Sequence, residues 1–123
     1  MGSIVTCELR PALAQVQDNK QECDAATTQA QINFCAGQAA DKVDRELNQA
    51  YQQISLNIAN EQKYLLTESQ QAWIKFRDAH CAFERSYYTG GTLSTTVYLT
   101  CLEKLTRQRL QQVEQTLAQQ KSR

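Results

Sequence analysis

Residues that interrupt helices are scarce in this chain, which contains four glycines and one proline, Pro11, in 123 residues. Alanine and glutamine, both compatible with helices, are abundant instead. The length suits one domain with a real core. No apolar run approaches the roughly 20 residues that a membrane span requires. The composition therefore predicts a small soluble domain of long helices with no transmembrane segment.

Apolar residues recur at steps of three and four in three segments, which is the pattern of a buried helix face. Helices are expected at 27–58, 62–87 and 93–119, with Thr27 and Thr28 before Gln31 as N-capping residues of the first and Thr92 as the cap of the third. The fold class is predicted as all-α, an antiparallel three-helix arrangement that forms a single domain over residues 27–119. The inward faces expected in chain order are Ile32, Ala36, Ala39, Val43, Leu47, Ala50, Ile54 and Ile58; Leu66, Ser69, Trp73, Phe76, His80, Phe83 and Tyr87; and Val97, Cys101, Leu102, Leu105, Leu110, Val113 and Leu117.

Gly90 and Gly91 are the only paired glycines in the chain, and they separate the second expected helix from the third. Glycine permits positive φ and ends a helix, so the two helices are expected to lie antiparallel about this turn. Cys81 and Cys101 lie about ten residues to either side of the turn, which places them opposite each other. The symmetry predicts a Cys81–Cys101 disulfide that braces the helical hairpin.

The other two cysteines in the body of the chain, Cys23 and Cys35, are left to join the N-terminal segment to the first helix, and Cys7 is expected to be unpaired. The chain lacks the close cysteine or histidine pairs of zinc sites, so no metal site is expected. Each bridge is expected to contribute ~3 kcal/mol to stability. Persistent disulfides indicate an oxidising compartment, periplasmic or extracellular. Four buried thiols in a cytosolic helical protein are the alternative.

Residues 1–26 are expected to form a leader and irregular segment before the helical domain. Ala12-Leu13-Ala14 matches the small-x-small pattern of a signal-peptidase site. The residues before it are too few and too polar for a working hydrophobic region. A clipped signal peptide, a misplaced start and a cloning remnant therefore all fit residues 1–14.

Candidate catalytic residues are few. The single histidine, His80, is next to Cys81, but adjacent helical residues diverge by about 100°, so the two do not form a nucleophilic pair. His80 is interpreted as a buried or half-buried histidine with one hydrogen-bond partner. The acidic pairs Asp41/Asp44 and Asp44/Glu46 belong to a charged helix surface and not to a substrate cleft. No enzyme activity and no cofactor are therefore expected.

The charge balance gives no support to nucleic-acid binding, because thirteen basic residues face thirteen acidic ones. Arg77 beside Trp73 could belong to a recognition surface. The favoured interpretation is that Arg77 pairs with an acidic residue of the first helix while Trp73 fills the core.

The strongest candidate for a binding surface is the tip of the predicted hairpin. From Ser86 to Thr100 the chain reads SYYTGGTLSTTVYLT, almost without charge. Tyrosine, serine, threonine and glycine are typical of rigid yet adaptable recognition surfaces. The alternative is a polar turn whose tyrosines face the core. The tip residues expected to bind a protein partner are Tyr87, Tyr88, Thr89, Gly90, Gly91 and Thr92.

A series of short patterns runs through the body of the chain: Leu47-Asn48 with Tyr51, Ser69-Gln70 with Trp73, Phe76-Arg77-Asp78 with Cys81, Gly90-Gly91-Thr92, Cys101, Leu105-Thr106 and Arg109. In this order they resemble the LprI-type lysozyme-inhibitor family, small helical cysteine-containing proteins of the bacterial envelope. The resemblance covers about residues 23–117. It implies an exported protein and, by the family's name, inhibition of lysozyme.

Charges are distributed unevenly along the chain. Residues 15–68 carry eight acidic and four basic residues, whereas residues 103–123 carry two acidic and five basic ones. Because many lysozymes are cationic and complementary charge steers association, Asp41, Asp44 and Glu46 are expected to face a lysozyme-like enzyme. The alternative function is a structural or assembly module of the bacterial envelope that packs its helices against another chain. An exposed apolar stripe on an outer helix face would favour that alternative.

Overall fold

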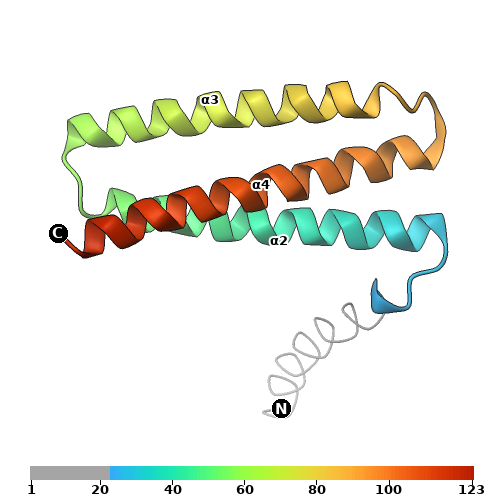
Figure 1. Cartoon of the computed structure of the whole chain (residues 1–123), viewed down its shortest axis with the longest axis horizontal. Helices are drawn as coiled ribbons and strands as arrows, with labels where there is room; N and C mark the ends of the chain where they lie inside the picture. Colours follow the sequence, from blue (N-terminus) through green and yellow to red (C-terminus); the bar gives the residue numbers. More distant parts are fainter. Residues whose placement is uncertain (1–22) are drawn as a thin grey trace, which may run out of the picture.

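The computed structural model describes residues 23–123 and confirms the all-α class (Figure 1). Three helices follow one another: α2 over Gln29–Ser55, α3 over Asn60–Arg85 and α4 over Gly91–Lys121. Each begins and ends within three residues of its expected bounds. Consecutive helices run in opposite directions, and in the view of Figure 1 α4 lies between α2 and α3.

Both predicted disulfides are present. Cys23 is joined to Cys35 in the second turn of α2, and Cys81 of α3 is joined to Cys101 of α4. The bridged Cα atoms are 5.5 and 5.6 Å apart, respectively. Most of the expected leader lies outside the described residues, including Cys7 and residues 1–14, for which a signal remnant was one interpretation.

Local sequence explains where two of the helices begin. The Thr28 hydroxyl accepts a hydrogen bond from the Gln31 N–H at 3.2 Å, and the Gln31 side-chain oxygen accepts one from the Thr28 N–H at 3.3 Å. This capping box confirms the expected start of α2. The cap expected for α4 is wrong, because Gly90 is the N-cap and Thr92 lies in the first turn. Gly90 and Gly91 have φ values of 75° and 79°, which explains why both positions are glycine.

The hydrophobic core lies between α2 and α4, so the inward faces expected for these helices are confirmed over their central turns. Ile32 is an exception, at 36% exposure. Thr106 of α4 is 1% exposed and was not among the expected core positions. The buried cluster comprises Val43, Leu47, Ala50, Tyr51, Ile54, Leu110 and Val113, with Ile58, Leu66, Trp73 and Leu117 packed around it.

The inward face expected for α3 is wrong for most of its aromatic residues. Phe76, Phe83 and Tyr87 are 57%, 56% and 72% exposed. The helix instead turns inward the side that contains Cys81, the residue of α3 that is fully buried. Because Cys81 must meet Cys101, the bridge fixes the rotation of α3 about its axis, and the aromatic residues a quarter-turn or more away are left outside.

Candidate functional site

The hairpin tip is exposed and lies at one end of the molecule, the same end as the start of α2 (Figure 1). Tyr87 and Tyr88 are 72% and 45% exposed, and Leu93 just after the turn is 51% exposed. A Cβ atom built on Gly90 or Gly91 would meet no atom within 4 Å, so the backbone of the turn faces open space. The tip residues predicted from the sequence therefore lie together at one accessible turn, and their tyrosines do not face the core.

Contacts between the end of α3 and the start of α4 hold the two helices together at the base of the tip. The Cys81–Cys101 disulfide joins the two helices below the turn. Closer to the turn, Arg85 donates to the Ser94 hydroxyl at 3.2 Å, and its guanidinium lies 4.6 Å from the centroid of the Tyr98 ring. These contacts restrict the turn before any partner arrives.

The N-terminal end of α2 also supports the tip. The Asn33 side-chain amide donates to the Thr92 carbonyl at 3.1 Å, and the Thr96 hydroxyl hydrogen-bonds to the Asn33 side chain. Gln29, one turn before Asn33, donates to the same Thr96 hydroxyl. These supporting residues were not among those predicted from the sequence. Their only signal was a pair of amide side chains four residues apart at the start of a helix.

The three acidic residues proposed to face a partner do not share one face of α2. Because successive helical residues are about 100° apart, Glu46 lies on the opposite flank from Asp41 and Asp44. The Asp44 carboxylate is engaged by Arg77 at 3.3 Å, so its charge is compensated within the protein. Asp41 is exposed, and Glu46 is half-buried.

Arg77 connects α3 to both neighbouring helices. Besides Asp44 of α2, it contacts Asp78 at 2.9 Å and donates weakly to the Thr106 hydroxyl of α4 at 3.5 Å. Its guanidinium lies 5.2 Å from the centroid of the Trp73 ring. The expected pairing of Arg77 with an acid of the first helix is confirmed. Trp73 is half-buried at the edge of the core.

Arg109 of α4 makes a second connection of the same kind. It donates to the Tyr51 hydroxyl of α2 at 2.9 Å and to the Ser69 hydroxyl of α3 at 2.9 Å. Tyr51 is 4% exposed, so this hydrogen bond also satisfies a phenol that lies in the core. Arg77 and Arg109 each contact all three helices.

The remaining candidates for chemistry are isolated. His80 has a 38% exposed side chain and lies 3.3 Å from Glu84, one turn along α3, which agrees with the expected histidine with one partner.

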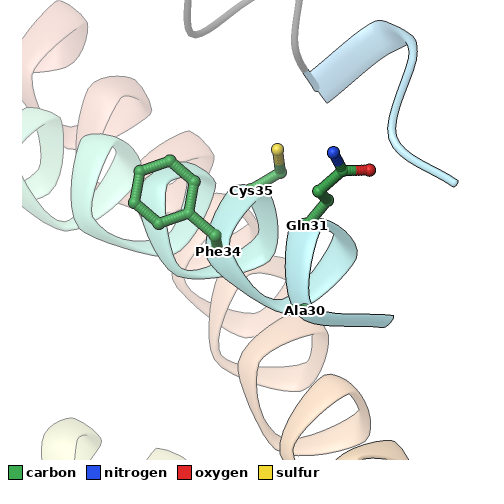
Figure 2. Close-up of a pocket in the computed structure, with 4 residues that line it drawn as sticks. All are labelled: Ala30, Gln31, Phe34 and Cys35. Atoms are coloured by element: carbon green, nitrogen blue, oxygen red, sulfur yellow. The ribbon is translucent and has the colours of Figure 1, made fainter. Parts of the chain in front are cut away.

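A hollow of about 210 Å³ on the first two turns of α2 is lined by Ala30, Gln31, Phe34 and Cys35 (Figure 2). These residues include no general acid or base. Within residues 23–123, no cluster of three or more histidine, cysteine, aspartate or glutamate residues could hold a metal ion.

Comparison with known proteins decides the family. A family model described as Lysozyme inhibitor LprI matches residues 21–113, well over half of the chain. The chain belongs to the LprI family. An uncharacterized protein of Rhizobium meliloti (strain 1021) is 28% identical over 128 residues, which cover 94% of this chain and 91% of that relative. No solved structure matches the chain.

Membership of the LprI family confirms the resemblance inferred from the motifs and supports a general role as a lysozyme inhibitor, which acts by binding a protein partner. Two disulfides are consistent with a location outside the cytoplasm. None of the helices in the described part of the chain is long and apolar enough to cross a membrane.

The residues that carry the LprI resemblance mostly hold the helices together. Tyr51, Ser69 and Arg109 form one connection, and Trp73 with Arg77 forms part of the other. Such residues identify the scaffold and not the surface that meets a partner. Among the matching patterns, Gly90-Gly91-Thr92 is the one whose residues are all exposed.

Proposed function

We propose that this protein acts in the periplasm or outside the cell as an inhibitor of a lysozyme-like peptidoglycan-cleaving enzyme, and that the hairpin tip is its inhibitory element. The active site of such an enzyme is a cleft flanked by two carboxylates. An inhibitor must enter or cover that cleft with a compact group. A helix face fits a narrow groove poorly, whereas a tight turn at the end of a hairpin fits well.

The observation that carries this proposal is the combination of exposure and restraint at the tip. Tyr87 and Tyr88 present aromatic surface to solvent, and tyrosine is a common anchor in protein interfaces. Contacts from Arg85 and Asn33, together with the Cys81–Cys101 bridge, hold the base of the turn. Restraint before binding lowers the entropy lost on binding.

Charge would contribute mainly to the rate of association. Asp41 is the exposed member of the acidic group, and attraction between an exposed acid and a cationic enzyme speeds encounter at low ionic strength. Asp44 and Glu46 contribute less to this attraction, because one is paired with Arg77 and the other is half-buried on the opposite flank.

The second candidate function is a structural or assembly module of the bacterial envelope. The observation that favours it is the set of exposed aromatic side chains along the outer side of α3, Phe76 and Phe83 among them. Apolar side chains that line one flank of a surface helix are typical of a site that packs against another protein.

A turbidity assay with peptidoglycan and a panel of cationic lysozymes of different structural classes tests the inhibitor proposal. The triple variant Tyr87→Ser/Tyr88→Ser/Thr89→Ala is expected to raise the inhibition constant at least ~100-fold, because a tyrosine at an interface hot spot contributes ~2 kcal/mol or more. The matched control is Tyr64→Ser, which removes a tyrosine that is 65% exposed on α3, far from the tip.

Two results would contradict the proposal in different ways. If the triple variant inhibits as well as the wild type, the tip is only a turn. If the wild type inhibits no lysozyme in the panel, the assembly-module candidate takes its place.

A further inference from the structure

One flank of α3 is an uninterrupted uncharged stripe. Its large members, Leu65, Phe76 and Phe83, are 60%, 57% and 56% exposed. The smaller members between them are also exposed. At 100° per residue all of these positions fall within about 80° of arc on the helix. This face, the α3 stripe, comprises Leu65, Ser69, Ala72, Phe76, Ala79 and Phe83.

Apart from Ser69, whose hydroxyl accepts from Arg109 of α4 at 2.9 Å at the edge of the stripe, the α3 stripe is separate from the side of α3 that packs on the rest of the protein. The packing side contains Leu66, Trp73, Arg77 and Cys81, whose positions are centred roughly 120° around the helix from the stripe. Cys81 is fully buried, whereas the large stripe residues keep more than half of their surface exposed. The stripe is therefore an apolar face of α3 that the described part of the chain leaves uncovered.

We propose that the α3 stripe binds the same stripe of a second copy of this chain. The two α3 helices lie antiparallel about a twofold axis at the level of Ile74. In this register Phe76 of one copy faces the partner's Ala72, and Leu65 faces the partner's Phe83. Ser69 faces the partner's Ala79.

The order of large and small side chains along the α3 stripe supports this antiparallel register. A twofold contact uses the same surface on both subunits, so that surface must be complementary to itself when reversed. Reading the stripe backwards from Phe83 places a small residue opposite each Phe76 and two small residues opposite each other at Ser69 and Ala79. Large side chains therefore meet small ones at the centre, and no charged group is buried.

The exposed area is close to what a specific dimer needs. A whole aromatic side chain has about 200 Å² of surface, so the half-exposed residues of the stripe present roughly 500 Å² per copy. Pairing would remove about 1,000 Å² in total, at the lower limit for a specific interface. The dimer is therefore expected to be weak, with a dissociation constant in the micromolar range.

A second copy fits this surface better than a cationic enzyme does. The stripe contains no acidic residue that would attract a basic partner. Pairing through the stripe leaves Tyr88 and the glycine turn free, because they lie beyond its last member, Phe83. Tyr87 of the tip adjoins the stripe, since its ring lies edge-on to that of Phe83 with centroids 5.3 Å apart. The dimer therefore does not require the inhibitory role of the tip, although the two surfaces meet at Tyr87.

Sedimentation equilibrium of the full chain over roughly 1–500 μM tests the dimer. The wild type is expected to shift from monomer to dimer across this range, whereas Phe76→Glu stays monomeric throughout. Tyr64→Glu is the matched control: Tyr64 is a 65% exposed aromatic residue of the same helix but lies about 100° from the centre of the stripe. This variant is expected to dimerise as the wild type does, and circular dichroism checks that all three proteins are folded.

Cross-linking tests the register. In a Cys7→Ser background, Leu65→Cys and Phe83→Cys proteins are mixed at high concentration and treated with a short bis-maleimide. An antiparallel dimer places the two different thiols together in the mixture. In each variant alone, like thiols lie roughly 27 Å apart along the axis and stay uncross-linked. Cross-linking of each variant alone would indicate a parallel pair and overturn the register.

Other outcomes also decide the proposal. A wild type that remains monomeric at 500 μM overturns the dimer, as does a Phe76→Glu variant that dimerises normally. If the wild type is monomeric and Phe76→Glu loses lysozyme inhibition while it remains folded, the stripe belongs to the enzyme contact and not to a second copy.

Discussion

Arg77 of α3 and Asp44 of α2 form an ion pair at 3.3 Å that joins two helices whose backbones hardly approach each other. The Arg77 side chain is 16% exposed and that of Asp44 is 48% exposed, so solvent screens the acidic end. Arg77 also covers the Trp73 ring and contacts Thr106. Arg77 is therefore expected to contribute to the free energy of unfolding through packing and hydrogen bonding as well as through charge.

Arg77→Ala is expected to lower the free energy of unfolding by about 1–2 kcal/mol, because it uncovers Trp73 and leaves the buried Thr106 hydroxyl without this donor. Arg107→Ala is the control, since Arg107 pairs with Glu103 on the exposed side of α4 at 2.8 Å. Such surface pairs contribute about 0.5 kcal/mol or less. Urea titration followed by circular dichroism measures both changes, and equal losses would show that Arg77 is not a structural connection.

Trp73 and Phe76 give a second matched pair on α3. Trp73→Ala is expected to cost about 3 kcal/mol, at the lower end of the range for large core residues because the ring is only half-buried. Phe76→Ala is expected to cost less than about 1 kcal/mol, because Phe76 is 57% exposed. Both values come from denaturant titration at a protein concentration of a few micromolar, where the monomer dominates. A larger loss for Phe76 would mean that the stripe is covered in solution even at low concentration.

The two disulfides are expected to contribute about equally to the free energy of unfolding but unequally to lysozyme inhibition. Removing either one by paired Cys→Ala substitution is expected to cost roughly 3 kcal/mol, because both close short loops. Only the Cys81→Ala/Cys101→Ala variant should also weaken lysozyme inhibition, since that bridge restrains the tip. Inhibition assays at a temperature where both variants are fully folded separate the two effects. Equal inhibition by both variants would argue against a restrained tip.

Several features of this fold could be predicted from local sequence patterns. The Thr28 and Gln31 capping box, the positive φ values of Gly90 and Gly91 and the symmetric placement of Cys81 and Cys101 each depend on local geometry. The core faces of α2 and α4 follow from periodicity, because most apolar residues of these helices lie on one side.

The rotation of α3 could not be predicted in the same way. This helix has apolar residues on two adjacent sides, one through Trp73 and the other through Phe76 and Phe83. Periodicity alone merges the two into a single broad face, and only the contact of Cys81 with Cys101 decides which one is buried. The hydrogen bond from Asn33 to the Thr92 carbonyl could not be predicted from the sequence either. It depends on how the N-terminal ends of α2 and α4 meet in the folded protein.

Asp41 and Asp44 provide a test of the charge contribution to inhibition. Both lie on α2 and differ by one helical turn, but Asp44 is paired with Arg77 whereas Asp41 is exposed. Asp41→Asn is expected to lower the association rate with a cationic lysozyme roughly two- to fivefold at low ionic strength, with little change in the dissociation rate. The difference in association rate should nearly vanish at 0.5 M salt. At that ionic strength salt screens the attraction between exposed charges beyond a few ångströms.

Asp44→Asn should behave in the opposite way. Its loss leaves Arg77 without its partner on α2, so the free energy of unfolding is expected to fall by about 1 kcal/mol, while the association rate changes less than it does for Asp41→Asn. Stopped-flow association at several salt concentrations and urea titration measure the two quantities separately. If Asp44→Asn slows association more than Asp41→Asn does, the carboxylate of Asp44 faces the enzyme despite its ion pair, and the contact surface extends along α2 away from the tip.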